Sequence, residues 1–369
     1  MNVEVMNMKK FTEKFAALII MSAFLLCLTG SANVGQAVYE AIRRCLETII
    51  PSLYAVMIMS QVIIRSGTAS LIPEWIRRIS ERIFGMEGFV LPIFAFSMFA
   101  GYPVGAKMLA GEYDKGRLTQ NRAEILCGLC YGAGPAFIFG CISGKLYSSE
   151  QVGLLIVISA VSANIILALF MSFFLRKSVK NDEIRGKFSF SADMLTECVI
   201  SGGRSVLEIC FMVTAFAVIS EFFRASGAAD MAGGLLSKLI GTDKETAVAL
   251  CCAFLDVTDI SGLPCGDYTI LPYVCGLVSF GGICVIFQVS AAVSERFSVI
   301  PLIFERLAAA LISGTICRSL LPYYIAYNVT TVSNVQIHAY NGYSPIPSLM
   351  IVIMTLWLFG EYCQKVNEL

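Results

Sequence analysis

Charged side chains are scarce in this sequence, and the two signs balance. Only 15% of the 369 residues are Asp, Glu, Lys or Arg, and 27 basic residues stand against 27 acidic ones. A chain without net charge lacks the electrostatic attraction that holds a nucleic acid or another polyanion. The composition therefore excludes nucleic acid as a partner.

Histidine and the common catalytic motifs are missing as well. His338 is the sole histidine, so neither a histidine-ligated metal site nor a Ser–His pair is expected. The sequence contains no GxxxxGK[ST], GxSxG or HExxH pattern. It predicts neither an enzyme nor an internal ATPase, and it implies no cofactor beyond a coupling ion.

Cysteine is plentiful, with 14 residues, but most of the cysteines lie in apolar segments. A thiol in such a segment behaves as a small hydrophobic group. Cys127 and Cys130 form a C-x-x-C pair, but no second pair or histidine lies near them in the sequence. We expect helix packing there rather than a metal site or a disulfide.

Long apolar runs dominate what is present. Hydrophobic residues make up 57% of the chain, and its mean hydropathy is +0.74. A membrane helix needs about 20 mostly apolar residues. The sequence predicts an all-α polytopic membrane protein, one transmembrane domain over residues 1–369, with the lipid bilayer as its surroundings. The eight expected spans are 15–31, 48–64, 122–143, 152–175, 205–223, 267–292, 299–322 and 345–363.

Two further apolar segments, 88–110 and 246–263, are interrupted by GYPVG and by DVTD. If both are re-entrant hairpins rather than spans, most Lys/Arg-rich loops fall on one side, as the positive-inside rule requires. The N-terminus is then cytoplasmic, and segment 15–31 is a retained anchor or a cleaved signal peptide. This topology places the loops near 65–82, 115–122 and 176–187 inside and those near Lys145 and 328–343 outside.

An internal repeat is indicated by two similar stretches, RCLETIIPSLYAVMIMSQVIIRSG at 44–67 and RSVLEICFMVTAFAVISEFFRASG at 204–227. Each is followed by an amphipathic stretch, a broken segment and a glycine-interrupted helix. We predict repeats over 44–175 and 204–325, inverted in the membrane, an arrangement in which transporters bind substrate near the midplane. Chance similarity between apolar helices is the alternative.

The first interruption predicts an anion site. Non-helical backbone at membrane depth must line a cavity or be buried in protein. Pro103 cannot continue the preceding helix, and a half-helix starting at Val104 would turn its positive end toward an anion. Lys107 adds a charge there, or else its side chain reaches to the cytoplasmic surface. The expected substrate-binding residues of this segment are Gly101, Tyr102, Pro103, Gly105 and Lys107.

The second interruption carries Asp256, Thr258 and Asp259, which are costly in an apolar segment. Their oxygens could hold Na⁺ or a proton for coupled transport. Alternatively, one aspartate pairs with Lys107, or both lie in an external loop. Gly134 with Pro135 is a third expected discontinuity. Three residues elsewhere are expected to line the same cavity or to serve helix packing: Gly134, Pro135 and Gln288. Glu305 and Arg306, near the start of a span, pair with neighbours or flank the inner face.

Residues 100–140, AGYPVGAKMLAGEYDKGRLTQNRAEILCGLCYGAGPAFIFG, resemble the signature of the sporulation integral membrane proteins with nucleoside-recognition (Gate) domains. FLDVTD and SFGGICVIFQV resemble that family's second-half elements. Tyr131 and Gly132 replace the usual Asn pair, and Asp256 and Asp259 replace Glu and Asn. The resemblance implies a multi-pass protein of the bacterial cell membrane or forespore membrane, which moves a small anion such as dipicolinate during spore formation.

Together these features predict a secondary transporter of a small carboxylated solute. A non-transporting membrane scaffold or sporulation factor is the main alternative, and nucleoside transport is a further one. The sequence does not indicate an oligomeric state.

Overall fold

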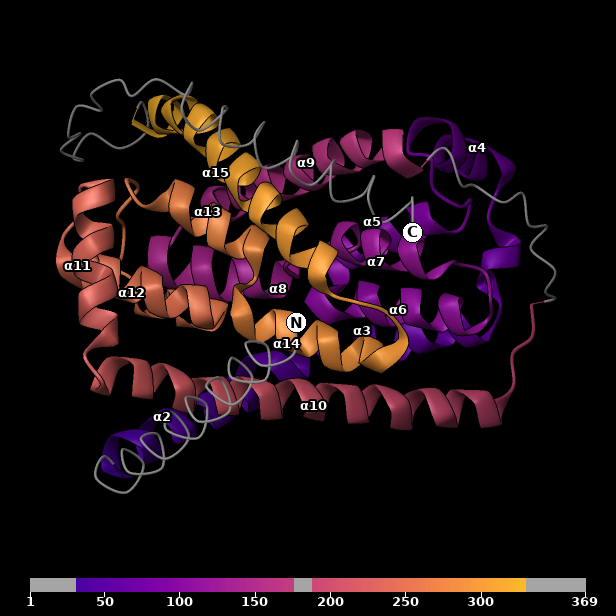
Figure 1. Ribbon diagram of the computed structural model, residues 1–369, viewed down its shortest axis with the longest axis horizontal. Coiled ribbons are helices and arrows are strands. Elements are labelled where there is room, and N and C mark those ends of the chain that lie inside the picture. The colour runs from indigo at the N-terminus through magenta and orange to yellow at the C-terminus, as the bar shows by residue number, and fades with distance from the viewer. Residues whose placement is uncertain (1–30, 176–187, 330–369) are drawn as a thin grey trace, which may run out of the picture.

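The computed structural model describes residues 31–175 and 188–329, and within these ranges all regular structure is helical (Figure 1). The predicted helices at 15–31 and 345–363 and the basic loop at 176–187 lie outside the described residues. Within the described ranges, five helices are long and apolar enough to cross a membrane: Asn33–Arg65, Glu150–Leu175, Ala192–Ala225, Leu271–Val293 and Ile300–Ile325. The chain is thus an all-α polytopic membrane protein.

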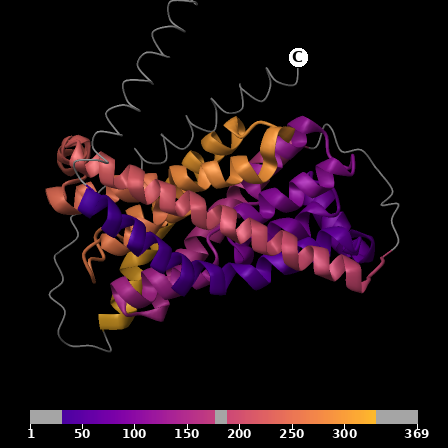
Figure 2. The same ribbon diagram turned by 90° about the horizontal axis from the view of Figure 1, so that it is seen from below.

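Two of the predicted spans belong to longer helices. Residues 48–64 fall in a continuous run made of α2 (Ser31–Arg44), the π-helical η1 (Cys45–Ile49) and α3 (Ile50–Arg65). Residues 205–223 fall in α10 (Ala192–Ala225), which lies along α2 and α3 on one face of the molecule (Figures 1 and 2). The approach of α10 to α3 is close because Gly202 has no side chain. A β-carbon there would lie 3.1 Å from the backbone nitrogen of Ile58.

Both predicted interruptions are present. Helix α5 (Val90–Ala100) ends at Gly101, whose φ of 97° favours glycine, and α6 (Tyr102–Asp114) begins directly after it. The half-helix thus starts two residues before the predicted Val104, with Pro103 in its first turn. Helix α12 (Lys244–Leu255) ends at Asp256, and the 3₁₀ helix η5 (Val257–Gly262) follows.

Two segments predicted as full-length spans, 122–143 and 267–292, are also broken, as the glycine-interrupted helices of the predicted repeats indicated. Helix α7 (Gln120–Leu129) is separated from α8 (Pro135–Phe137) and the π-helical η3 (Ile138–Tyr147) by residues 130–134. Helix α13 (Leu271–Phe280) is separated from α14 (Gly282–Val293) by Gly281. Gly281 and the following Gly282 both have positive φ. Hydropathy misses these breaks because they are short and their residues are apolar or glycine.

The described elements occur in the same order in both halves of the chain. After α3 come the amphipathic α4 (Glu74–Ile83), the broken pairs α5–α6 and α7–α8/η3, and α9 (Glu150–Leu175). After α10 come α11 (Ala228–Ile240), the broken pairs α12–η5 and α13–α14, and α15 (Ile300–Val329). Corresponding long helices pack on each other across the halves, α3 on α10 and α9 on α15. The repeats themselves and their inverted orientation stay predictions.

Loop contacts join segments that the predicted topology puts on the same side. At one end, the backbone N–H of Gly266 donates to the carbonyl of Leu146, at 2.8 Å. At the other end, Arg296 forms an ion pair with Asp114, at 2.8 Å. The first pair belongs to loops expected outside, and the second belongs to loops expected in the cytoplasm.

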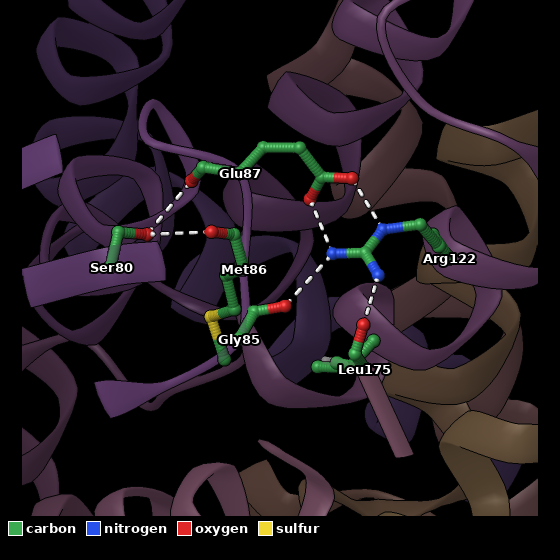
Figure 3. Close-up of polar contacts among 6 residues, drawn as sticks. All are labelled: Ser80, Gly85, Met86, Glu87, Arg122 and Leu175. Atoms are coloured by element: carbon green, nitrogen blue, oxygen red, sulfur yellow. Dashed lines mark hydrogen bonds and ion pairs between the residues drawn. The ribbon is translucent and has the colours of Figure 1, made fainter. Parts of the chain in front are cut away.

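A buried arginine fastens four elements of the first half together (Figure 3). Arg122 forms a forked ion pair with Glu87, with one arm at 3.0 Å, and donates to the carbonyls of Leu175 (2.7 Å) and Gly85 (3.0 Å). Ser80 of α4 in turn donates to the carbonyl of Glu87, at 2.8 Å. The network satisfies the last carbonyl of α9 and holds α4, α7 and the segment between α4 and α5 in place around it.

Candidate functional site

The four backbone breaks meet in pairs inside the molecule. A β-carbon at Gly134 would lie 3.6 Å from the Cα of Gly101, so the breaks at Gly101 and at 130–134 touch. A β-carbon at Gly282 would lie 2.9 Å from the nitrogen of Val257, so the breaks at Gly281 and Asp256 touch as well. Each half thus contributes one pair of adjoining breaks.

Two buried tyrosines join these pairs across the halves. Tyr102 donates a hydrogen bond to the carbonyl of Val278, and Tyr131 donates one to the carbonyl of Phe280, each 2.7 Å long. Their ring centroids are 4.9 Å apart. The last carbonyls of a helix have no partner within it. The hydroxyls of the first half therefore satisfy the end of α13, where the Gly281 break begins.

A cavity, named here the central cavity, opens where the breaks meet. It encloses about 690 Å³ of empty space, with the open solvent at its mouth included. Its wall is mainly apolar, and few polar side chains face it. The predicted residues that line it are Gly101, Tyr102, Pro103, Gly134, Asp256, Thr258 and Gln288.

The N-terminus of α6 lies at the central cavity, because Gly101, Tyr102 and Pro103 all line it. The first turn of a helix carries N–H groups without intrahelical partners, and the helix dipole makes this end positive. With 13 residues, α6 is long enough to have such a dipole. This end of the cavity therefore favours an anionic group.

Asp256 supplies a carboxylate to the same cavity. Its side chain is almost completely buried, with 1% exposed. One carboxylate oxygen accepts a hydrogen bond from the backbone N–H of Thr258, at 3.0 Å, and the other has no hydrogen-bond partner. An unpartnered buried oxygen is available for a proton or a cation.

The three residues predicted to couple ions have different surroundings in the structure. Arg44, at the end of α2, donates to the hydroxyl of Thr258 (3.2 Å) and forms an ion pair with Asp259 (3.3 Å). Thr258 also lines the central cavity, whereas Asp259 faces Arg44. Of the three, Asp256 has the carboxylate that is open to a ligand. The pairing of an aspartate with Lys107, left open by the sequence, is replaced by the pair of Asp259 with Arg44.

Lys107 lies beside the central cavity rather than in its wall. Its ammonium group donates to the hydroxyl of Ser205 on α10. Together with Glu208 it lines a smaller side cavity of about 300 Å³. Pro103 and Gln288 line both cavities, so Lys107 is one layer of side chains away from the predicted anion site.

Two other predicted residues shape the breaks. A side chain on Gly105 would collide with the carbonyl of Cys130, so this glycine allows α6 to pack against the break at 130–134. Pro135 opens α8, where its missing N–H costs no helical hydrogen bond. Neither of them is among the residues that line the central cavity.

Sequence reasoning missed Arg44 and Tyr131 as site residues. Arg44 was visible only as the first residue of the repeat stretch at 44–67, not as a partner of the second interruption. Tyr131 was visible as a departure from the Asn pair of the resembled family. In the described ranges, no group of three or more His, Cys, Asp or Glu side chains is arranged to hold a metal ion.

The chain is similar to the sporulation integral membrane protein YlbJ of Bacillus subtilis (strain 168). The two are 29% identical over 171 residues, which are 44% of this chain and 41% of the relative. The chain thus spans less than half of the relative's length in this match. The similarity confirms the resemblance that residues 100–140 indicated, and the relative, like this chain, is an integral membrane protein. No family model matches the sequence, and no solved structure matches it.

Proposed function

We propose that this protein is a secondary transporter of a small carboxylated solute, which it binds in the central cavity. One observation carries the proposal: the predicted breaks at Gly101 and Asp256, 155 positions apart in the sequence (256 − 101), line the same cavity. Transporters built from repeats bind their substrates at such paired discontinuities. A non-transporting scaffold would not need a cavity at this place.

The lining of the cavity supports a particular kind of solute. The apolar wall suits a ring or another hydrophobic body, and the N-terminus of α6 suits a carboxylate. Dipicolinate, which the family resemblance implies, combines an aromatic ring with carboxylates. We extend to this chain a role in spore formation, because its relative is a sporulation integral membrane protein. The cell membrane or forespore membrane would be its site of action.

Asp256 supports coupling to an ion. Its unpartnered oxygen lies in the cavity wall, where a proton or Na⁺ would neutralise it before an anion binds nearby. Because the sequence lacks a phosphate-binding loop, the energy would come from an ion gradient or from the solute gradient itself. We propose transport without chemical conversion, so the protein is not an enzyme.

Uptake of radiolabelled dipicolinate into proteoliposomes tests the proposal. Asp256→Asn removes the cavity carboxylate and Lys107→Ala removes the charge beside the cavity, so both are expected to lower uptake at least tenfold. Asp230→Asn and Lys244→Ala make the same chemical changes in an exposed ion pair between α11 and α12, and they should transport normally. Size-exclusion chromatography of each variant checks its folding.

Three outcomes are distinguishable. Loss of uptake in the two site variants, with both controls active, supports a carrier with its site at the breaks. Uptake that unlabelled nucleoside blocks better than unlabelled dipicolinate would replace the solute and keep the carrier. The absence of uptake under every imposed ion gradient, with either labelled solute, would favour the scaffold.

A further inference from the structure

Two adjacent charged residues lie buried where α15 packs against α7, α9 and α13. Glu305 is 1% exposed and Arg306 is 0% exposed. Figure 1 shows α15 running past α13 toward the region of α7. Neither residue lines the central cavity. A charge buried in this way is costly unless it is paired or serves a function.

The carboxyl group of Glu305 has no hydrogen-bond partner at either oxygen. It occupies space that a side chain at position 128 would fill, because a β-carbon on Gly128 would collide with it. The titratable and charged groups that face it are the thiols of Cys127 and Cys130 from the α7 side and the neighbouring Arg306. A buried carboxylate without donors is unfavourable, whereas the neutral acid fits the same space.

Arg306 contacts residues at and beside the break at 130–134. It donates to the side-chain oxygen of Asn164, at 2.9 Å, and its guanidinium lies 4.8 Å from the ring centroid of Tyr131. Two of its nitrogens have no hydrogen-bond partner. Asn164 in turn donates to the carbonyl of Tyr131, at 2.9 Å, which holds the break at 130–134 beside the arginine.

This arrangement connects Glu305 with the central cavity. The ring of Tyr131 packs on the ring of Tyr102, and Tyr102 lines the cavity. Arg306 is therefore two aromatic rings away from the site, and both rings are buried. At low dielectric, a positive charge at that range is felt in the cavity. The affinity of the cavity for an anion therefore depends on whether Glu305 balances the charge of Arg306.

We infer that Glu305 is a proton-binding site, and that its proton frees the positive charge of Arg306 to favour anion binding in the central cavity. With the proton bound, the Glu305–Arg306 pair carries one net positive charge; without it, the pair is neutral. A proton and an anion would therefore be taken up together. The coupling rests on the proposed function, but the proton site itself does not.

The proton site is tested on the purified full chain, without any solute. Dicyclohexylcarbodiimide reacts with a protonated carboxyl in apolar surroundings. The carboxyl oxygen adds to the carbodiimide carbon while the acid proton passes to nitrogen, and migration of the acyl group from oxygen to nitrogen then gives a stable N-acylurea with no leaving group. We expect mass spectrometry to find this adduct on Glu305 in mildly acidic buffer, and several-fold less of it in alkaline buffer. Glu150, exposed at the start of α9, is the internal control and should remain unmodified.

Infrared spectroscopy tests whether Glu305 binds a proton even if dicyclohexylcarbodiimide fails to reach it. The wild-type protein should show a protonated-carboxyl stretch that Glu305→Gln lacks, since glutamine keeps the shape of the neutral acid. Gly128→Ala should shift this stretch, because its methyl group enters the space of the carboxyl. Identical carboxyl spectra for wild type and Glu305→Gln at acidic and alkaline pH would overturn the proton site.

Coupling is tested in proteoliposomes. An inward proton gradient should drive dipicolinate accumulation in the wild type, while Glu305→Gln should exchange solute across the membrane but not accumulate it. Gradient-driven accumulation by Glu305→Gln equal to the wild type would overturn the coupling. If the wild type transports nothing, the proposed function fails, whereas the labelling and infrared results still decide whether Glu305 binds a proton.

Discussion

The hydroxyl of Tyr102 donates a 2.7 Å hydrogen bond to the carbonyl of Val278, a residue 176 positions further along the chain. Tyr102 is the first residue of α6, directly after the Gly101 break, and Val278 is in the last turn of α13, before the Gly281 break. One side-chain bond therefore holds a discontinuity of the first half against a discontinuity of the second. The wall of the central cavity depends on that attachment.

Tyr102→Phe removes this bond and leaves a buried carbonyl without its partner. We expect the free energy of unfolding to fall by about 1–3 kcal/mol, because an unsatisfied buried polar group retains its desolvation cost. Thermal unfolding in detergent measures the change. Tyr39→Phe removes a hydroxyl from a side chain that is 61% exposed, and it should have little effect. Equal stability of the two variants would show that the Val278 carbonyl finds another donor.

Gly105→Ala should prevent α6 from packing against the break at 130–134. The added methyl group would collide with the carbonyl of Cys130, and a backbone atom cannot move aside as a flexible side chain can. We expect a loss of about 1–3 kcal/mol or more, as in other overpacked cores. Gly234→Ala, in α11, is the matched control, because a β-carbon there meets nothing within 4 Å. It should be neutral or slightly stabilising.

Arg122→Ala should be among the most damaging substitutions outside the breaks. It leaves the carboxylate of Glu87 buried without its partner, and the carbonyls of Leu175 and Gly85 lose their hydrogen-bond donor (Figure 3). We expect a loss of about 3–5 kcal/mol in unfolding measurements. Arg78→Ala breaks an exposed pair with Glu74 and should cost less than about 1 kcal/mol. Similar losses for both arginines would contradict the role assigned to burial.

Cys265 offers a test of the predicted topology. Its side chain is exposed, and its loop contacts the end of η3 near Lys145, which is expected outside. A membrane-impermeant maleimide added to intact cells should therefore modify Cys265, as mass spectrometry of the purified chain would show. Cys265→Ser provides the blank. Modification in inverted vesicles, but not in intact cells, would reverse the predicted orientation of the protein in the membrane.

The helix breaks show which features of the site can be predicted from short stretches of sequence. Pro103 and Asp256 were recognisable because proline lacks a donor and an aspartate is out of place in an apolar run. The Gly281 break was indicated only as a glycine within a helix, since glycine is common in membrane helices and hydropathy averages over it. The sequence left the position of Lys107 open for another reason: its partner, Ser205, belongs to α10, and no local pattern reveals which helix packs beside it.

Composition and hydropathy are enough to establish an all-α membrane protein with interrupted helices, because the cost of burying backbone polar groups in lipid acts on every residue locally. Packing alone decided that Arg44 would bind Asp259, that Tyr102 would reach Val278, and that Glu305 would lie without a partner. These relationships join residues or helices far apart in the chain. Their energies depend on how whole helices fit together, which no short stretch of sequence encodes.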